Sequence, residues 1–121
     1  ENQVETGIPS AGTPHFKAIS LLSNYDPVDA NWHSIDLIAA GMPVGIKGVT
    51  IRYEFTSNGT HYLQFSDTSA GTIWGKGVVP VANGYASGEA HIKISSTGLL
   101  WWQAQAANIS GFYLNTVDYD C

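Results

Sequence analysis

The sequence predicts an all-β fold, an antiparallel β-sandwich of jelly-roll-like order with roughly eight strands. Charged residues make up only 12% of the 121 residues, whereas hydrophobic residues make up 44% and aromatic residues 12%. Aromatic and β-branched side chains are those that strands favour. Short segments of alternating polarity recur between turns rich in Gly, Asn and Ser, and no ten-residue window carries the apolar stripe of a helix.

The length is typical of a single domain that buries its own core. Residues 1–14 contain two glycines and two prolines and show no apolar period. This composition is typical of an arm or linker, and a frayed terminus is the alternative. We therefore expect an N-terminal arm at residues 1–14 and the sandwich at residues 15–121.

The first segments of the sandwich are the least regular. Residues 15–23 place apolar side chains on one face and predict the first strand. Residues 24–31 are expected to form a loop, because Pro27 cannot donate a ladder hydrogen bond. Residues 32–39 form a second apolar segment, which a following glycine and proline bring to an end.

Residues 46–56 show the clearest alternation in the chain. One face carries Val49, Ile51, Tyr53 and Phe55, and the other face is polar. The dipeptide Asn58-Gly59 follows, and Asn-Gly tolerates positive φ at both positions of a tight turn. Apolar residues alternate again from His61 to Phe65. The pattern therefore predicts a β-hairpin in which these two strands pair.

The rest of the chain shows loops and shorter strands. Residues 67–77 hold three glycines and Trp74 and are expected to form a long loop, with a short strand inside it as the alternative. The polar residues 84–88 are expected to form a turn. Further strands are predicted at residues 78–81, 89–95, 99–105 and 112–119.

Charge and cysteine content exclude several classes. Ten acidic residues against five basic ones give a net charge of −5, so no basic face exists for nucleic acid or an anionic membrane. The longest apolar runs are too short to cross a bilayer, and we expect no membrane insertion. The sole cysteine, Cys121, cannot form an internal disulfide, and its role is not indicated.

Motifs for catalysis and metal binding are not found. There is no G-x-S-x-G elbow in a strand-turn-helix context, and the four histidines lie in separate segments. Glu54 and Glu89 are placed mid-strand, but both fall on the polar face of their pattern. We therefore expect no enzyme activity, no catalytic residues, no cofactor and no metal. The alternatives are a hydrolase site assembled across strands and a calcium site in residues 24–31.

Trp101 and Trp102 are adjacent in a predicted strand and must point to opposite faces. Leu100, Trp102 and Ala104 form the more apolar phase and are expected in the core. Leu99 and Trp101 lie on the other phase, so this strand is apolar on both faces. A strand buried on both faces needs a covering layer on each. Leu99 and Trp101 are therefore the predicted oligomer interface. The alternative for Trp101, which shares its phase with Gln103 and Gln105, is a ligand contact.

Exposed aromatic rings that lie beside carboxylates or amides suit sugars, which have apolar C–H faces and hydroxyl edges. Loops at the ends of a sandwich commonly carry binding residues. The first predicted glycan contact is Trp74 with Asp67, and the second is Tyr25 with Asp26. In the alternative interpretation, Trp74 closes the open end of the sandwich.

Three segments resemble the small β-sandwich domains of tailed-bacteriophage virion proteins, such as tail-fibre tips and capsid decoration proteins. They are DLIAAGMPVGIKGVTI at residues 36–51, VPVANG at residues 79–84 and YLNTVDY at residues 113–119. The resemblance spans about residues 30–120 and implies a non-enzymatic domain located in the virion. It also implies a homotrimer that contacts other virion proteins and, in tips, a host glycan. The alternatives are a carbohydrate-binding module of a secreted bacterial enzyme and a small hydrolase.

Overall fold

The computed structural model describes residues 14–57, 61–79, 84–105 and 109–121. These ranges hold nine strands and no helix. The strands are β1 Pro14–Phe16, β2 Ser20–Tyr25, β3 Trp32–Asp36, β4 Gly48–Ser57, β5 His61–Ser66, β6 Ile73–Val79, β7 Gly84–Lys93, β8 Leu99–Ala104 and β9 Ile109–Asp120. No helix suited to crossing a membrane occurs among these residues. The predicted arm lies outside the described ranges except for Pro14.

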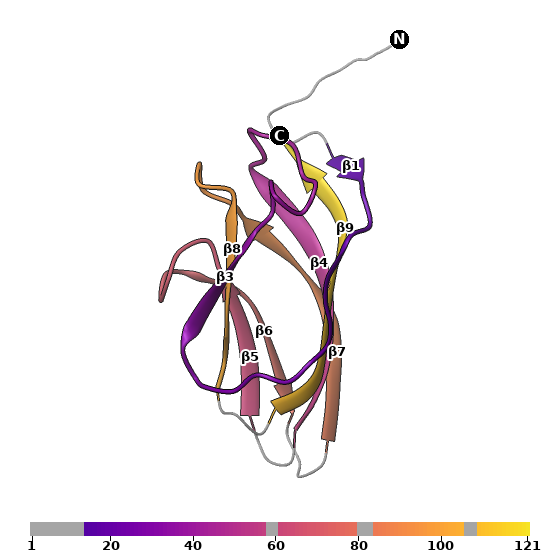
Figure 1. Cartoon of the computed structure of the whole chain (residues 1–121), viewed down its shortest axis with the longest axis vertical. Coiled ribbons are helices and arrows are strands. Elements are labelled where there is room, and N and C mark those ends of the chain that lie inside the picture. Colours follow the sequence, from indigo (N-terminus) through magenta and orange to yellow (C-terminus); the bar gives the residue numbers. More distant parts are fainter. Residues whose placement is uncertain (1–13, 58–60, 80–83, 106–108) are drawn as a thin grey trace.

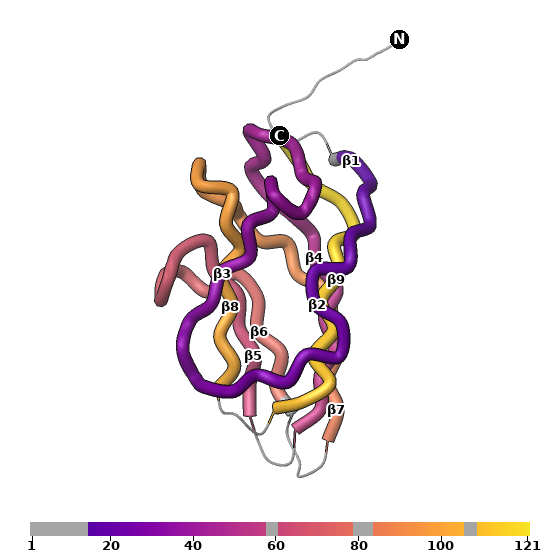
Figure 2. Tube along the Cα trace, in the orientation of Figure 1, coloured from indigo at the N-terminus to yellow at the C-terminus, as the bar shows by residue number. Residues whose placement is uncertain are grey.

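The strands form two antiparallel sheets that face each other (Figure 1). In one sheet β9, β4 and β7 lie side by side, and both β1 and β2 pair with the free edge of β9. The other sheet has the order β3-β8-β5-β6. The chain changes sheet at most of its connections, as the tube in Figure 2 shows. This strand order is that of a jelly roll, so the predicted fold class is confirmed.

The predicted hairpin around Asn58-Gly59 is wrong, and the turn itself lies outside the described residues. Strand β4 pairs with β7 and β9, whereas β5 pairs with β6 and β8. Ser57 Oγ and His61 Nδ1 lie within hydrogen-bonding distance, 2.8 Å, and join the two strand ends where the chain changes sheet. The alternation of β4 and β5 puts the apolar side chains of each strand on one face, and this holds for a hairpin as well as for two strands in opposite sheets. In this structure the apolar faces of β4 and β5 meet across the core, whereas in a hairpin they would lie side by side in one sheet.

Two further expectations concern β6 and β7. The loop expected at residues 67–77 ends where β6 begins at Ile73, which agrees with the alternative of a strand within these residues. The turn predicted at residues 84–88 is the first half of β7. Trp74 therefore lies in a strand. It occupies a bulge, because Phe65 pairs with Gly75 while Ser66 pairs with Ile73.

Glycines in β6 and β7 make room for the ring of Tyr53 between the sheets. A Cβ at Gly77 would lie 2.5 Å from Tyr53 Cε1, and a Cβ at Gly88 would lie 2.7 Å from its hydroxyl oxygen. Burial raises the pKa of Tyr53. The glycines that resembled loop signals are therefore packing positions inside strands.

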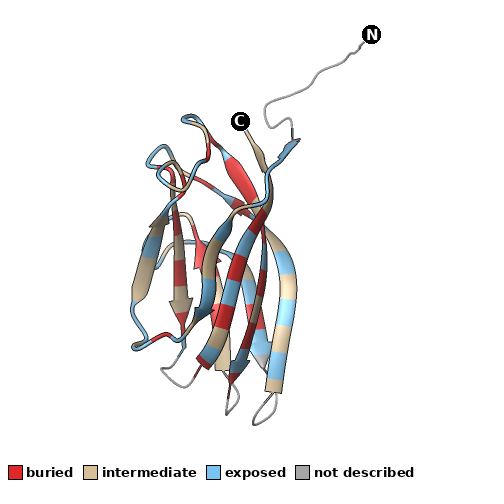
Figure 3. Ribbon diagram, turned by 45° about the vertical axis from the view of Figure 1, so that its right-hand side comes forward, coloured by how far each residue is buried: buried red, intermediate tan, exposed pale blue. Residues whose placement is uncertain are grey.

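The core fills the space between the sheets, and buried and exposed residues alternate along the strands (Figure 3). The alternation expected for β4 is confirmed, because Val49, Ile51, Tyr53 and Phe55 are all buried. The prediction for β8 is also confirmed. Trp102 is 3% exposed in the core, whereas Trp101 is half-buried on the outer face.

Candidate functional site

A depression of about 200 Å³ lies on the outer face of the five-stranded sheet. Antiparallel pairing brings polar side chains of β7, β4 and β9 into rows across this face, because paired residues point to the same side. The two rows at the depression are Glu89–Arg52–Asn115 and Ser87–Glu54–Tyr113. Tyr85 lies one row further along β7 and completes the lining.

Hydrogen bonds hold the side chains of this depression in place. The hydroxyl of Tyr85 donates to Glu54 Oε2 at 2.7 Å. Arg52 donates to Glu89 Oε2 from Nη2 at 2.6 Å and from Nε at 3.2 Å. The Arg52–Glu89 pair is exposed to solvent, so it contributes more to the orientation of the guanidinium than to the stability of the domain.

Sequence reasoning placed Glu54 and Glu89 on a polar strand face, which the structure confirms, but it missed Tyr85 and Tyr113 as lining residues. Tyr85 was assigned to a turn. The available signal was the alternation along residues 84–93, in which every second side chain from Tyr85 to Lys93 is exposed.

Trp74 and Asp67, the first predicted glycan contact, lie together. The indole Nε1 of Trp74 donates to Asp67 Oδ1 at 3.4 Å, a long hydrogen bond, and 42% of Trp74 is exposed. Asp67 follows β5 and Trp74 lies in the bulge of β6, so the β5–β6 connection brings them together. Their binding role stays a prediction.

Tyr25 and Asp26, the second predicted contact, lie at the end of β2. The half-buried ring of Tyr25 meets the buried indole of Trp102 edge-on, with centroids 5.7 Å apart. Asp26 accepts a hydrogen bond from the N–H of Gly111 at 3.1 Å. Both residues therefore fasten the chain after β2 to the body of the sandwich, and their binding role also stays a prediction.

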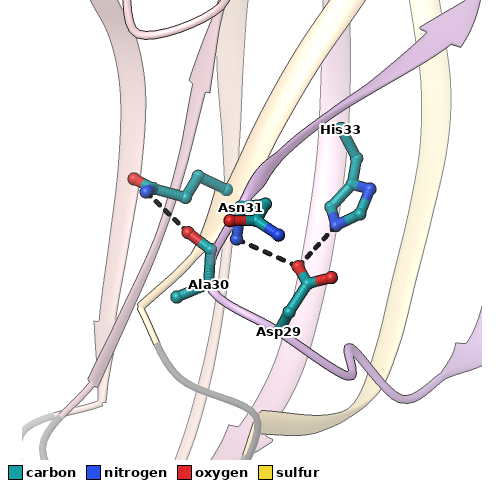
Figure 4. A network of polar contacts seen from close by, with 5 residues as sticks. Asp29, Ala30, Asn31 and His33 are labelled. Atoms are coloured by element: carbon teal, nitrogen blue, oxygen red, sulfur yellow. Dashed lines mark hydrogen bonds and ion pairs between the residues drawn. The ribbon is translucent and has the colours of Figure 1, made fainter.

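The loop that follows is tied down by a polar network (Figure 4). Asp29 Oδ1 accepts the N–H of Asn31 at 2.9 Å and lies 2.7 Å from His33 Nε2. The amide of Gln103 donates to the carbonyl of Ala30 at 2.9 Å. The backbone hydrogen bond from Asn31 and the side chain of His33 lower the pKa of Asp29. Asp29 Oδ1 and the carbonyl oxygen of Ala30 are therefore engaged by groups of this chain and hold the loop in place.

The predicted interface residues Leu99 and Trp101 lie on the outer face of the four-stranded sheet. Trp101 is flanked by Ser34 on β3 and Ser66 on β5, and both neighbours are small. In the next row, Gln64 Nε2 donates to Gln103 Oε1 at 2.6 Å. The amides on this face are thus hydrogen-bonded within the chain.

One set of side chains has the order of a hydrolase triad. His91 Nε2 lies 3.2 Å from Asp120 Oδ1, and His91 Nδ1 lies 2.9 Å from Thr50 Oγ1. Thr50 lies inside β4, which pairs on both sides. Among the described residues, no group of three or more His, Cys, Asp or Glu side chains is arranged to hold a metal.

The strand order and these surfaces define a jelly-roll β-sandwich domain. No family model matches the sequence, and no curated protein matches it. Similar solved structures include the virus-like particle of the extra small virus of the prawn Macrobrachium rosenbergii. That match has a TM-score of 0.45 and 9% identity, and it covers 99% of this chain and 86% of that chain.

Two further similar structures are a carbohydrate-binding module and a viral coat protein. The module, from Cellvibrio mixtus lichenase 5A in complex with cellotriose, has a TM-score of 0.46 and 17% identity over 88% of this chain and 97% of that chain. The tobacco streak virus coat protein has a TM-score of 0.42 and 12% identity over 97% of this chain and 92% of that chain. The likeness concerns the arrangement of strands alone.

Proposed function

We propose that the domain is a non-enzymatic structural and binding domain of a virion, of the tail-fibre-tip or capsid-decoration type. The proposal for a bacteriophage virion is supported by the sequence segments at residues 36–51, 79–84 and 113–119. In this proposal, copies of the chain associate as a homotrimer through the outer face of the four-stranded sheet and contact other virion proteins.

The proposed self-association rests on one apolar surface of this sheet. We call this surface the tryptophan face and define it by Trp32, Leu99 and Trp101. All three are half-buried within a single chain, and they share the face because Trp32 pairs with Gln103 and Trp101 with Ser34. Because both side chains are already half-buried, covering the rest of Leu99 and Trp101 would contribute on the order of 1–3 kcal/mol per protomer.

The polar groups of this face also favour contact with another chain. Gln64 and Gln103 bond to each other, and Gln103 also bonds to Ala30. The ammonium of Lys76 lies 4.2 Å from the ring centroid of Tyr62. Because these groups have partners within the chain, a second chain can exclude water from them at a lower cost than from unpaired amides.

Light scattering of the purified chain, up to high micromolar concentration, tests the association. We expect a trimer for the wild type and a monomer for Trp101→Gln. The matched control is Tyr113→Gln, which removes an exposed aromatic ring from the opposite sheet and should leave the trimer intact. A wild-type chain that stays monomeric contradicts the proposal.

Absence of catalysis is part of the proposal. Glu54 is engaged by Tyr85 and Glu89 by Arg52 on an open sheet face. Assays with a panel of glycans and esters are expected to show no turnover. Robust turnover that Glu54→Gln or Glu89→Gln abolishes would support the hydrolase alternative instead.

A second candidate function is that of a carbohydrate-binding module of a secreted enzyme, which would be extracellular. It is favoured by the exposed indole of Trp74 beside Asp67. Trp74→Ala separates the two roles of this residue. A variant that folds normally but loses glycan binding supports the site, whereas a destabilised variant that still binds removes Trp74 from it. The genes that neighbour this one distinguish the two candidate functions, because a virion domain is expected beside genes for other virion proteins and a carbohydrate-binding module beside genes for secreted enzymes.

A further inference from the structure

We infer that the depression between Tyr85 and Tyr113 binds one neutral sugar ring of a glycan. The inference rests on the proposal that the domain is a binding domain. It does not depend on self-association, which uses the opposite sheet. It also assigns the sugar to a different place from the predicted contacts at Trp74 and Tyr25.

The two tyrosines supply the walls. Tyr85 on β7 is 58% exposed and Tyr113 on β9 is 37% exposed. Their strands flank β4, and neighbouring strands are about 4.8 Å apart, so β7 and β9 lie roughly 10 Å from each other. The Tyr85 hydroxyl donates to Glu54, so its ring reaches from β7 towards β4, and the depression of about 200 Å³ between this ring and Tyr113 is the space for one pyranose ring. The C–H faces of a sugar pack favourably on such rings.

The floor between the tyrosines offers both acceptors and donors. Glu54 is half-buried there, and the hydrogen bond from Tyr85 uses only Oε2, so Oε1 can accept a sugar hydroxyl. Arg52 donates to Glu89 through Nε and Nη2, and neither bond uses Nη1. Vicinal sugar hydroxyls donate and accept at the same time, and a carboxylate beside a guanidinium meets both requirements.

Asn115 and Ser87 extend this floor. Asn115 pairs with Arg52 across β4 and β9, and Ser87 pairs with Glu54 across β4 and β7. An amide and a hydroxyl each donate and accept, so they can bond hydroxyls of either orientation. Because all of these side chains project from paired strands, they are positioned before the ligand arrives, which lowers the entropic cost of binding.

Charge and size select the class of ligand. Glu54 and Glu89 outnumber Arg52, and the whole chain carries a net charge of −5, so an anionic sugar is repelled. The volume of about 200 Å³ is below the roughly 300–1,000 Å³ of sites that hold drug-sized molecules. A single uncharged ring is the ligand that fits both limits.

The test is a titration of the isotope-labelled full chain, followed by amide chemical shifts. The probes are the methyl glycosides of glucose, galactose, mannose and N-acetylglucosamine, with methyl glucuronide as the anionic counterpart. We expect at least one neutral glycoside to bind with a millimolar dissociation constant and to shift amides of residues 52–54, 85–87 and 113–115. The glucuronide should bind about tenfold more weakly or not at all.

Variants separate the site from the fold. Tyr113→Ala should weaken binding by about tenfold or more, and Glu54→Gln, which preserves size, should weaken it without altering the melting temperature. Trp101→Gln is the matched control and should bind as the wild type does. The inference is overturned if no neutral glycoside shifts these amides, if the shifts gather at Trp74, or if the glucuronide binds as tightly. A monomeric protein that binds the neutral sugar would contradict only the proposed trimer.

Discussion

The hydroxyl of Thr116 accepts a hydrogen bond from the N–H of Ile19 at 2.8 Å and donates one to the carbonyl of Lys17 at 2.6 Å. Thr116 is 2% exposed and lies in β9, to which both β1 and β2 are paired. Residues 17 and 19 belong to the connection between these two strands. The N–H of Lys17 and the carbonyl of Ile19 bond the backbone of β9, and the hydroxyl of Thr116 satisfies the other backbone group of each of these two residues.

Thr116→Val is expected to lower the free energy of unfolding by about 2–4 kcal/mol, because it leaves a donor and an acceptor without a partner. Thr116→Ser keeps the hydroxyl and should cost only about 1 kcal/mol for the lost methyl group. Urea denaturation measures both values. A loss in Thr116→Val that is no larger than the loss in Thr116→Ser would contradict the structural role of the hydroxyl.

Trp102→Ala should destabilise the domain by about 3–5 kcal/mol, because the indole is buried and touches three aromatic rings. Those rings belong to Tyr25, His33 and Phe112. Trp101→Ala at low protein concentration should cost distinctly less, since this indole is only half-buried. Thermal unfolding of the two variants gives the comparison, and a reversed order would contradict the assigned faces of β8.

Gly88→Ala is expected to destabilise by about 1–3 kcal/mol, because the new methyl group would meet the Tyr53 hydroxyl at 2.7 Å. In a Tyr53→Leu background the end of the ring is gone, and the same change should cost much less. A double-mutant cycle measures this coupling. Additive effects of the two substitutions would show that Gly88 is required for another reason.

Asp29 should make stability depend on pH in the acid range. Its pKa in the folded state is lowered from the ordinary 3.8, chiefly by the N–H of Asn31 and then by His33. The unfolded state thus binds the proton more readily, and the stabilisation is complete above about pH 4 and is lost as the pH falls through the lowered value. Wild type and Asp29→Asn should converge in denaturation experiments at low pH. A constant difference down to about pH 2 would contradict this.

Burial along single strands could be predicted from the sequence, but the pairing of strands could not. Alternation in β4 and β8 shows which side chains face the core, because the side-chain period of a strand is two residues. The Asn58-Gly59 signal predicts a turn, but it does not say which strand pairs with β4. A jelly-roll order places most consecutive strands in different sheets, and β4 and β5 are such a pair. The partner of β4 is decided by contacts with residues 84–93 and 109–120, which are distant in the sequence.

The depression illustrates the same limit for a site. The polar positions Glu54 and Glu89 could be read from alternation. Tyr85 and Tyr113 come together only because β7 and β9 take places on either side of β4. Pairing between segments this distant in the sequence depends on the whole fold, and no local pattern encodes it. Glycines also made β6 and β7 hard to recognise from the sequence, because Gly77 and Gly88 make room for the ring of Tyr53, which lies on another strand.

The position of β9 also sets an order of events during synthesis. This strand pairs with β1, β2 and β4, yet it follows all of them in the sequence. Until it leaves the ribosome, β4 lacks one neighbour and the first strands have none. The chain must then close a loop over nearly its whole length before the contacts of β9 with β1 and β2 can form. The entropic cost of this closure comes before the stabilising contacts, so folding is slow. Until then the nascent chain exposes unpaired strand edges, which are prone to aggregation. We therefore expect folding to begin only after translation has passed β9, and we expect chaperones to bind the chain before that point.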